Sequence, residues 1–309
     1  MLHSLSLYRS QTTIEPHPTV LAAGPRRGLQ FLSATPRRII AIGDGSEAAL
    51  NAAWRAALIA QNWGAPVHLL DVRKSSSGRS ELGGTFEHWL RQTVAVRQLS
   101  NARASGGERR PENTALESAG LLVTHAEDGF RYFEWLFGTR IERLVRKFPI
   151  PVLIVKQPAS RRYRRVLVGV KLDPQASELV AGARIVAPGA RVDVVHMLGT
   201  SYEFRLRLAD ASEAVVRAHR TRTHRDAYRQ LNDLIEAACG HEANAVVPRI
   251  VVGSAPERLL EMGAAARAGL IVLGKRSRHW LADFFLDRGV ACRVLAEAPG
   301  DVLLVPGGG

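Results

Sequence analysis

Gly43 and Gly45 follow a short apolar segment, and their spacing could serve ligand binding. The segment reads RRIIAIGDGSEAAL, so a strand rich in isoleucine ends in a glycine turn before an alanine-rich helix. Glycine allows phosphate to approach the backbone N–H groups at a helix start. The pattern Gly43-x-Gly45-x-x-Ala48 therefore predicts a dinucleotide-binding turn, another nucleotide site, or a turn without ligand. Asp71, at the end of the next apolar segment, lies where a ribose-binding acid would lie in the dinucleotide interpretation.

The segments around this turn occur twice in the chain. The strand 37–43 has a counterpart at 164–170, and a predicted helix follows each strand, at 46–63 and 174–186. The correspondence is closest at the two ends, where GTRIERLVRKFPIPVLIV (138–155) aligns without a gap with RGVACRVLAEAPGDVLLV (288–305). Such internal similarity indicates a tandem duplication. We expect three parts: a flexible leader at 1–36, a shortened first domain at 37–157 and a second domain at 164–306.

Strands alternate with helices in both halves. This order predicts βαβ units with right-handed crossovers and a parallel sheet that is covered on both faces. The expected fold class is α/β, with two tandem doubly wound parallel-sheet domains. In the second half we expect five strands, at 164–170, 191–198, 245–252, 269–274 and 301–305, and helices at 211–238 and 255–268. In the first half the third strand is expected at 93–99 or is absent.

Three motifs resemble those of the universal stress protein family. They are GDGSEAAL after the first strand, GSAPERLL after the third strand of the second half, and the RVL…AP…VLLV ending. The resemblance covers residues 37–306. It implies the adenine nucleotide alpha hydrolase-like fold, with ATP rather than NAD as the candidate cofactor. It also implies that the last strands of the two halves pair, so that the chain resembles a dimer fused into one polypeptide.

The resemblance also implies which residues would bind the nucleotide. Family members that bind ATP use an Asp after the first strand, near the base, and a loop patterned Gly-x2-Gly-x9-Gly-Ser/Thr for the phosphates. In the first half, Asp44 matches the acid, and Gly138 and Thr139 match the end of the loop. His125 and Asp128 replace the first two glycines, and a carboxylate there should repel phosphate.

The second half keeps a different part of the phosphate loop. Gly274 matches the first glycine, Ser277 replaces the second, and Gly289 follows an arginine at the third position, one residue late. Lys171 stands where the first half has Asp44. We therefore expect at most weak ATP binding, and loop geometry ranks the first half as the better candidate.

The overall composition limits the remaining partner classes. The net charge is +13, carried almost entirely by arginine, but the aromatic residues do not follow the arginines, which disfavours nucleic acid as a partner. No uninterrupted apolar stretch is long enough to span a bilayer, which argues against a membrane partner. The two cysteines form no disulfide framework, so we expect a cytoplasmic protein. His219 and His224 are five residues apart on a predicted helix, which places them on different faces, and we expect no metal site.

The expected function is regulation by binding in a stress response, without enzymatic turnover. The predicted mouth of the sheet offers no plausible general base, metal ligand set or nucleophile. An adenine nucleotide is the candidate ligand, a protein partner stays unidentified, and a homodimer is a further option. Two alternatives stay open: slow ATP hydrolysis, and a dinucleotide-binding enzyme that uses the Gly43-x-Gly45 turn.

Overall fold

The computed structural model describes residues 38–43, 46–71, 96–99, 119–126, 150–173, 175–240, 245–275 and 290–306. The predicted leader, 1–36, lies outside these ranges. The described elements, in chain order, are β1 (Ile39–Gly43), α2 (Glu47–Trp63), β2 (Val67–Asp71), β3 (Val96–Leu99), β4 (Leu121–His125), β5 (Val152–Val155), β6 (Arg165–Val170), α7 (Gln175–Val186), β7 (Arg191–Leu198), α8 (Ser201–Leu208), α9 (Glu213–Cys239), β8 (Val246–Val252), α10 (Ala255–Ala265), β9 (Leu270–Lys275), α12 (Val290–Glu297) and β10 (Asp301–Pro306).

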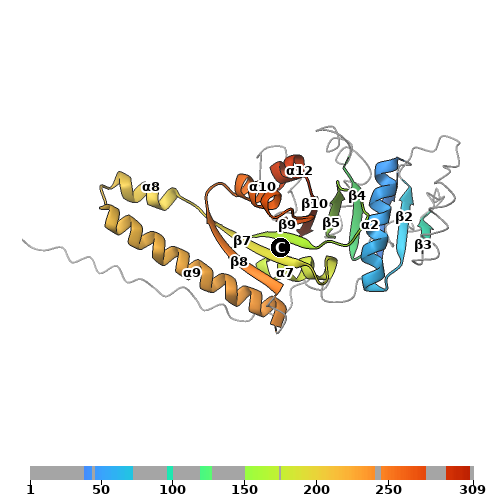
Figure 1. Cartoon of the computed structure of the whole chain (residues 1–309), viewed down its shortest axis with the longest axis horizontal. Coiled ribbons are helices and arrows are strands. Elements are labelled where there is room, and N and C mark those ends of the chain that lie inside the picture. Colours follow the sequence, from blue (N-terminus) through green and yellow to red (C-terminus); the bar gives the residue numbers. More distant parts are fainter. Residues whose placement is uncertain are drawn as a thin grey trace, which may run out of the picture.

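All ten described strands belong to one sheet that runs through both halves (Figure 1). Its order is β3-β2-β1-β4-β5-β10-β9-β6-β7-β8. Neighbouring strands are parallel within each half, and the two halves meet in an antiparallel pair between β5 and β10. Numbered from its own first strand, each half has the order 3-2-1-4-5. The predicted α/β class and the doubly wound parallel arrangement are confirmed.

The pairing of β5 with β10 is symmetric in sequence as well as in space. Leu153 lies opposite Leu303, Val152 lies opposite Leu304, and Val302 lies opposite Ile154. In the gapless alignment of 138–155 with 288–305, Leu153 corresponds to Leu303. The pair is therefore self-complementary, as in an isologous interface between two subunits. This is the contact between last strands that the resemblance implies.

The strands bury side chains on both faces, as parallel sheets do. In β6, Val166 and Val168 pack into one apolar cluster with residues of α2, α7 and α9. Leu167, between them, packs into the other cluster with Leu259 of α10 and residues of α12. Consecutive residues of a strand point to opposite faces, so one apolar run supplies both clusters.

Helix α2 shows why an alanine-rich segment forms this element. The Ser46 side chain accepts a hydrogen bond from the Ala49 N–H (3.1 Å), and Gly64 ends the helix in the left-handed conformation. Small alanines line the buried face and let the helix lie close to the sheet. At the other end, the Trp63 indole donates to the Ile185 carbonyl at 2.7 Å, which joins α2 to α7 of the second half.

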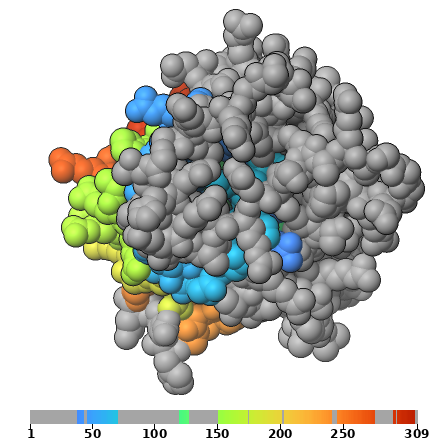
Figure 2. Space-filling model, turned by 90° about the vertical axis from the view of Figure 1, so that its right-hand side faces the viewer, coloured from blue at the N-terminus to red at the C-terminus, as the bar shows by residue number. Residues whose placement is uncertain are grey.

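A buried polar cluster holds the segment between the halves. Asp301, fully buried at the start of β10, accepts hydrogen bonds from the backbone N–H groups of Lys156 and Gln157 at 2.8 and 2.9 Å. The Tyr163 hydroxyl donates to the same carboxylate at 2.6 Å, and the Arg55 guanidinium of α2 lies 3.1 Å from it. Burial and the neighbouring Asp301 raise the pKa of Tyr163 well above its ordinary value. The Arg55 guanidinium also donates to the Arg161 carbonyl of this segment at 2.7 Å. In Figure 2, blue residues of the first half lie beside yellow-green residues from the middle of the chain.

The second half also carries a helical hairpin. Helices α8 and α9 project well past the end of the sheet in Figure 1. They are joined by the ion pair of Glu203 with Arg220 and by the pair of Arg207 with Glu213 at 3.3 Å. The sequence predicts α9 within two residues at its start, and it gives no signal for α8.

Candidate functional site

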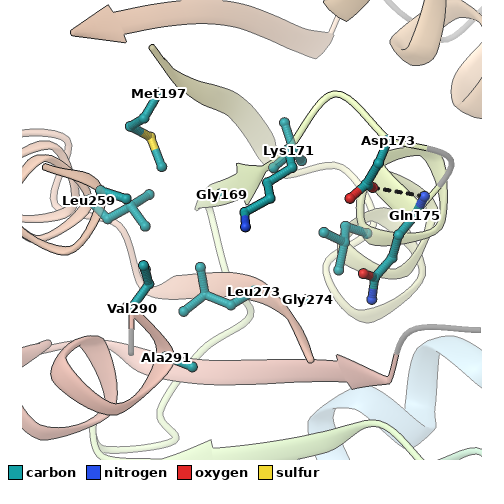
Figure 3. Close-up of a pocket in the computed structure, with 13 residues that line it drawn as sticks. Gly169, Lys171, Asp173, Gln175, Met197, Leu259, Leu273, Gly274, Val290 and Ala291 are labelled. Atoms are coloured by element: carbon teal, nitrogen blue, oxygen red, sulfur yellow. Dashed lines mark hydrogen bonds between the residues drawn. The ribbon is translucent and has the colours of Figure 1, made fainter. Parts of the chain in front are cut away.

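A cavity of about 110 Å³ opens at the carboxyl ends of the second-half strands. In open parallel sheets this edge is where ligands bind. The cavity lies between the ends of β6, β7 and β9 and the first residues of α7, α10 and α12 (Figure 3). Its described lining consists of Gly169, Val170, Lys171, Asp173, Gln175, Leu179, Met197, Ala255, Leu259, Leu273, Gly274, Val290 and Ala291.

Most of the wall is apolar. Leu259, Leu273, Met197 and Val290 surround the space in Figure 3. Gly169 lets Leu273 and Leu259 pack against the backbone of β6, because an added Cβ would stand 2.9 Å from Leu273 Cδ2 and 3.1 Å from Leu259. A concave, mostly apolar space with few polar groups is typical of small-molecule sites.

Gly274, the first glycine of the predicted phosphate loop, lies in this wall. It is the next-to-last residue of β9, and a Cβ added there would stand 3.1 Å from the side-chain amide of Gln175. The Gln175 amide nitrogen donates to the Val305 carbonyl at 3.4 Å, which holds the side chain over the end of β10. A residue with a side chain at 274 would therefore enter the cavity or displace Gln175.

Two charged residues belong to the described lining of the cavity, and they have different roles. One carboxylate oxygen of Asp173 accepts the Gln175 N–H at 3.0 Å, so this acid caps the start of α7. Lys171 follows β6 directly, and its side chain is exposed. In Figure 3 its amino group points into the cavity. Within the described ranges, no hydrogen bond or ion pair engages this ammonium.

His196 lies beside the cavity, one residue before Met197 on β7. Its Nδ1 lies 3.2 Å from the Val170 carbonyl, and since a carbonyl only accepts, Nδ1 is the donor. Burial lowers the pKa of His196, and the Val170 hydrogen bond and the Asp173 charge offset this in part. The ring therefore favours the neutral state beside the cavity.

The same edge of the first half is built differently. His125 stands where the second half has Gly274, and its ring is 1% exposed. Its Nε2 lies 3.5 Å from the Ser46 hydroxyl, at the start of α2. Gly43 and Asp71 lie opposite each other on β1 and β2, so the structure brings together these two residues of the dinucleotide interpretation.

The other predicted binding residues, Asp44, Gly138, Thr139, Ser277 and Gly289, lie outside the described residues. Four further lining residues belong to none of the motifs predicted to bind a ligand: Gly169, Met197, Leu259 and Gln175. A usable signal was present, since Gly169 and Met197 stand at the ends of predicted strands and Gln175 at a predicted helix start. Leu259 belongs to the helix predicted at 255–268, which no motif linked to the site.

Among the described residues, no group of three or more His, Cys, Asp or Glu side chains comes together in a way that could hold a metal ion. None of the described helices is both long and apolar enough to cross a membrane.

Comparison with known proteins gives matches for both halves. Residues 162–306 match the Universal stress protein family. A functionally unknown protein from Pseudomonas aeruginosa PAO1 is 19% identical, with a TM-score of 0.55, and the match covers 90% of this chain and 94% of that chain. A universal stress protein from Archaeoglobus fulgidus DSM 4304 is 14% identical, with a TM-score of 0.55 and coverage of 88% and 96%. These two likenesses show the same fold over most of the chain.

A universal stress protein from Archaeoglobus fulgidus in complex with dAMP is 19% identical. That match covers 47% of this chain and 99% of that chain, with a TM-score of 0.30. No curated protein matches the chain significantly.

Proposed function

We propose, from the premise that residues 162–306 belong to the universal stress protein family, that the chain binds a purine nucleotide in the second-half cavity. In this proposal the protein regulates a cytoplasmic stress response through binding, without turnover. ATP is the ligand that the family resemblance implies, and we expect it to bind weakly. The observation that carries the proposal is the cavity at the carboxyl ends of β6, β7 and β9, with Gly274 in its wall.

The choice of the second half reverses the ranking made from sequence. That ranking rested on Asp44, Gly138 and Thr139 in the first half, which lie outside the described residues. At the one loop position that is described in both halves, Gly274 leaves backbone open to the cavity. His125 places a buried imidazole at the matching position of the first half. A side chain at a position of close approach keeps phosphate away from the backbone.

The chemistry of the described lining supports binding without turnover. It contains no serine, threonine, cysteine or histidine, and one oxygen of its one carboxylate, Asp173, is engaged by the Gln175 N–H at the start of α7. A general base needs an available acceptor within reach of the proton that it removes. Slow ATP hydrolysis and dinucleotide chemistry at Gly43 and Asp71 are the competing functions.

Calorimetric titration of the full chain with ATP tests the proposal. We expect weak, saturable binding that Gly274→His lowers at least about tenfold, or 1.4 kcal/mol. Gly199→Ala is the matched control, because a Cβ at Gly199 meets no atom within 4 Å. Phosphate release measured in the same samples should stay at the rate without protein. Unchanged binding by Gly274→His would contradict the proposed site, and protein-dependent phosphate release would support the enzyme instead.

A further inference from the structure

We propose that the second-half cavity prefers a purine with a carbonyl oxygen at its 6-position over adenine, and that Lys171 binds this oxygen. Guanine and hypoxanthine carry such an oxygen, whereas adenine carries an amino group there. The inference rests on the proposed function, since it concerns the base of a nucleotide bound in the same cavity.

The apolar part of the cavity accepts either kind of purine. Leu259, Leu273, Met197 and Val290 offer no hydrogen-bonding groups from their side chains. Purine bases have similar size and flat faces, so burial against these side chains stabilises them to a similar extent. Discrimination between purines must therefore come from the polar residues of the lining.

Lys171 supplies the positively charged donor of the described lining. One Asp173 oxygen caps α7, and the Gln175 amide nitrogen donates to the Val305 carbonyl, so both of these side chains are held at the start of α7. The Lys171 amino group points into the cavity and has no partner within the described ranges. An ammonium has three donors and no acceptor. It can bind a carbonyl oxygen or a ring nitrogen, but it cannot accept from an amino group.

Guanine and adenine differ at the 6-position, where one carries a hydrogen-bond acceptor and the other a donor. The 6-oxygen and N7 of guanine both accept, and a lysine can contact both at once. In adenine, N7 accepts but its neighbour is the 6-amino group, which turns its donors toward the ammonium. Because an unpaired polar group loses hydration in an apolar site, the mismatch weakens adenine binding. The sequence places the opposite charge, Asp44, at the matching position of the first half.

Titration of the full chain with GTP, ITP and ATP tests the base preference. We expect GTP and ITP to bind about fivefold to a hundredfold more tightly than ATP, the range that one such contact gives. ITP lacks the 2-amino group of GTP, so similar binding of the two assigns the preference to the 6-oxygen. Equal binding of all three nucleotides, or tighter binding of ATP, would overturn the inference and leave the proposed function standing. Failure of all three to bind would overturn both.

A second set of measurements assigns the preference to Lys171. Lys171→Met keeps the length and removes the charge, so it should bring GTP and ITP down to the affinity of ATP. Arg217→Met is the control, because it removes one positive charge from an exposed position on α9. Competition with tripolyphosphate tests the alternative that Lys171 binds the phosphates instead of the base. If Lys171→Met weakens tripolyphosphate and all three nucleotides by the same factor, Lys171 binds phosphate and the inference is wrong.

Discussion

The two halves have one strand order and a symmetric contact, yet they differ at the edge where ligands bind. The register of β5 against β10 places Leu153 opposite its counterpart Leu303. At the carboxyl ends, in contrast, Gly274 corresponds to His125, and Lys171 corresponds to Asp44. The two halves share the apolar pattern that builds the sheet, while the residues that could touch a ligand differ between them.

A second difference lies at the junction of the halves. The gapless alignment pairs Asp301 with Pro151. Asp301 collects two backbone N–H groups, the Tyr163 hydroxyl and the Arg55 guanidinium, whereas a proline at the matching site offers none of this chemistry. One of the two equivalent strand starts has thus become the anchor for the connecting segment. The junction is therefore asymmetric, although the strands that form it pair symmetrically.

The largest effect is expected from removing this anchor. Asp301→Ala leaves the Arg55 guanidinium, which is 4% exposed, without its carboxylate. Breaking a buried ion pair by removing one partner costs about 3–5 kcal/mol. We expect a loss of this size in the free energy of unfolding, measured by urea denaturation.

Glu297→Ala is the control for Asp301→Ala. It removes an exposed carboxylate 3.0 Å from Arg293, and surface pairs contribute about 0–1 kcal/mol. If the two variants lose similar amounts of stability, the cluster at Asp301 does not hold the halves together.

A smaller loss of stability is expected from removing the N-cap of α2 than from removing Asp301, and α10 gives the comparison. Ser46 accepts the Ala49 N–H and caps α2, whereas the Ser254 side chain makes no such bond at the start of α10. We expect Ser46→Ala to lower the free energy of unfolding by about 1 kcal/mol and Ser254→Ala to leave it nearly unchanged. Urea denaturation of the two variants checks this. Equal losses would mean that the capping bond of Ser46 contributes nothing specific.

Sequence patterns were sufficient for the sheet because its strands are apolar runs between turn residues. The expected strand 191–198 has the bounds of β7. The other expected strands of the second half differ from the structure by one residue, at both ends for β9 and at one end for β6, β8 and β10. Such runs can bury both faces inside a covered sheet, and their short length between turn residues favours strands over helices. The third strand of the first half, left open from sequence, is present as β3.

Helix α8 and the cavity could not be predicted from the sequence. In SYEFRLRL, apolar and polar residues alternate with a period of two, a strand pattern, but the segment is helical and pairs with α9 through Glu203 and Arg220. That ion pair joins residues on separate helices, so no pattern within the segment itself indicates a helix. The cavity likewise needs Leu259, Met197 and Gly274, which only the folded chain brings together.

The second strands of the two halves end in different titratable residues. Gly43 lies opposite Asp71, and Val170 lies opposite His196, so the ladder places the acid and the histidine at equivalent positions. In the second half this exchange puts a largely neutral ring beside the cavity, because burial lowers the pKa of His196. The pH dependence of stability should therefore reflect the presence of His196 at this position.

The smallest expected effect is the loss of stability in mild acid. Below pH of about 6.5, His196 in the unfolded chain takes up a proton, while the folded chain resists protonation because its pKa is lowered. The unfolded state then binds more protons, so the free energy of unfolding falls as the pH drops from 6.5 toward the folded pKa. His196→Asn cannot titrate and keeps a donor for the Val170 carbonyl, so it should lose less stability than the parent chain between pH 7.5 and 5.5. Urea denaturation of both proteins at the two pH values measures the difference, and every other titratable group is common to both. Equal losses would show that the acid sensitivity arises elsewhere and that His196 is not held neutral beside the cavity.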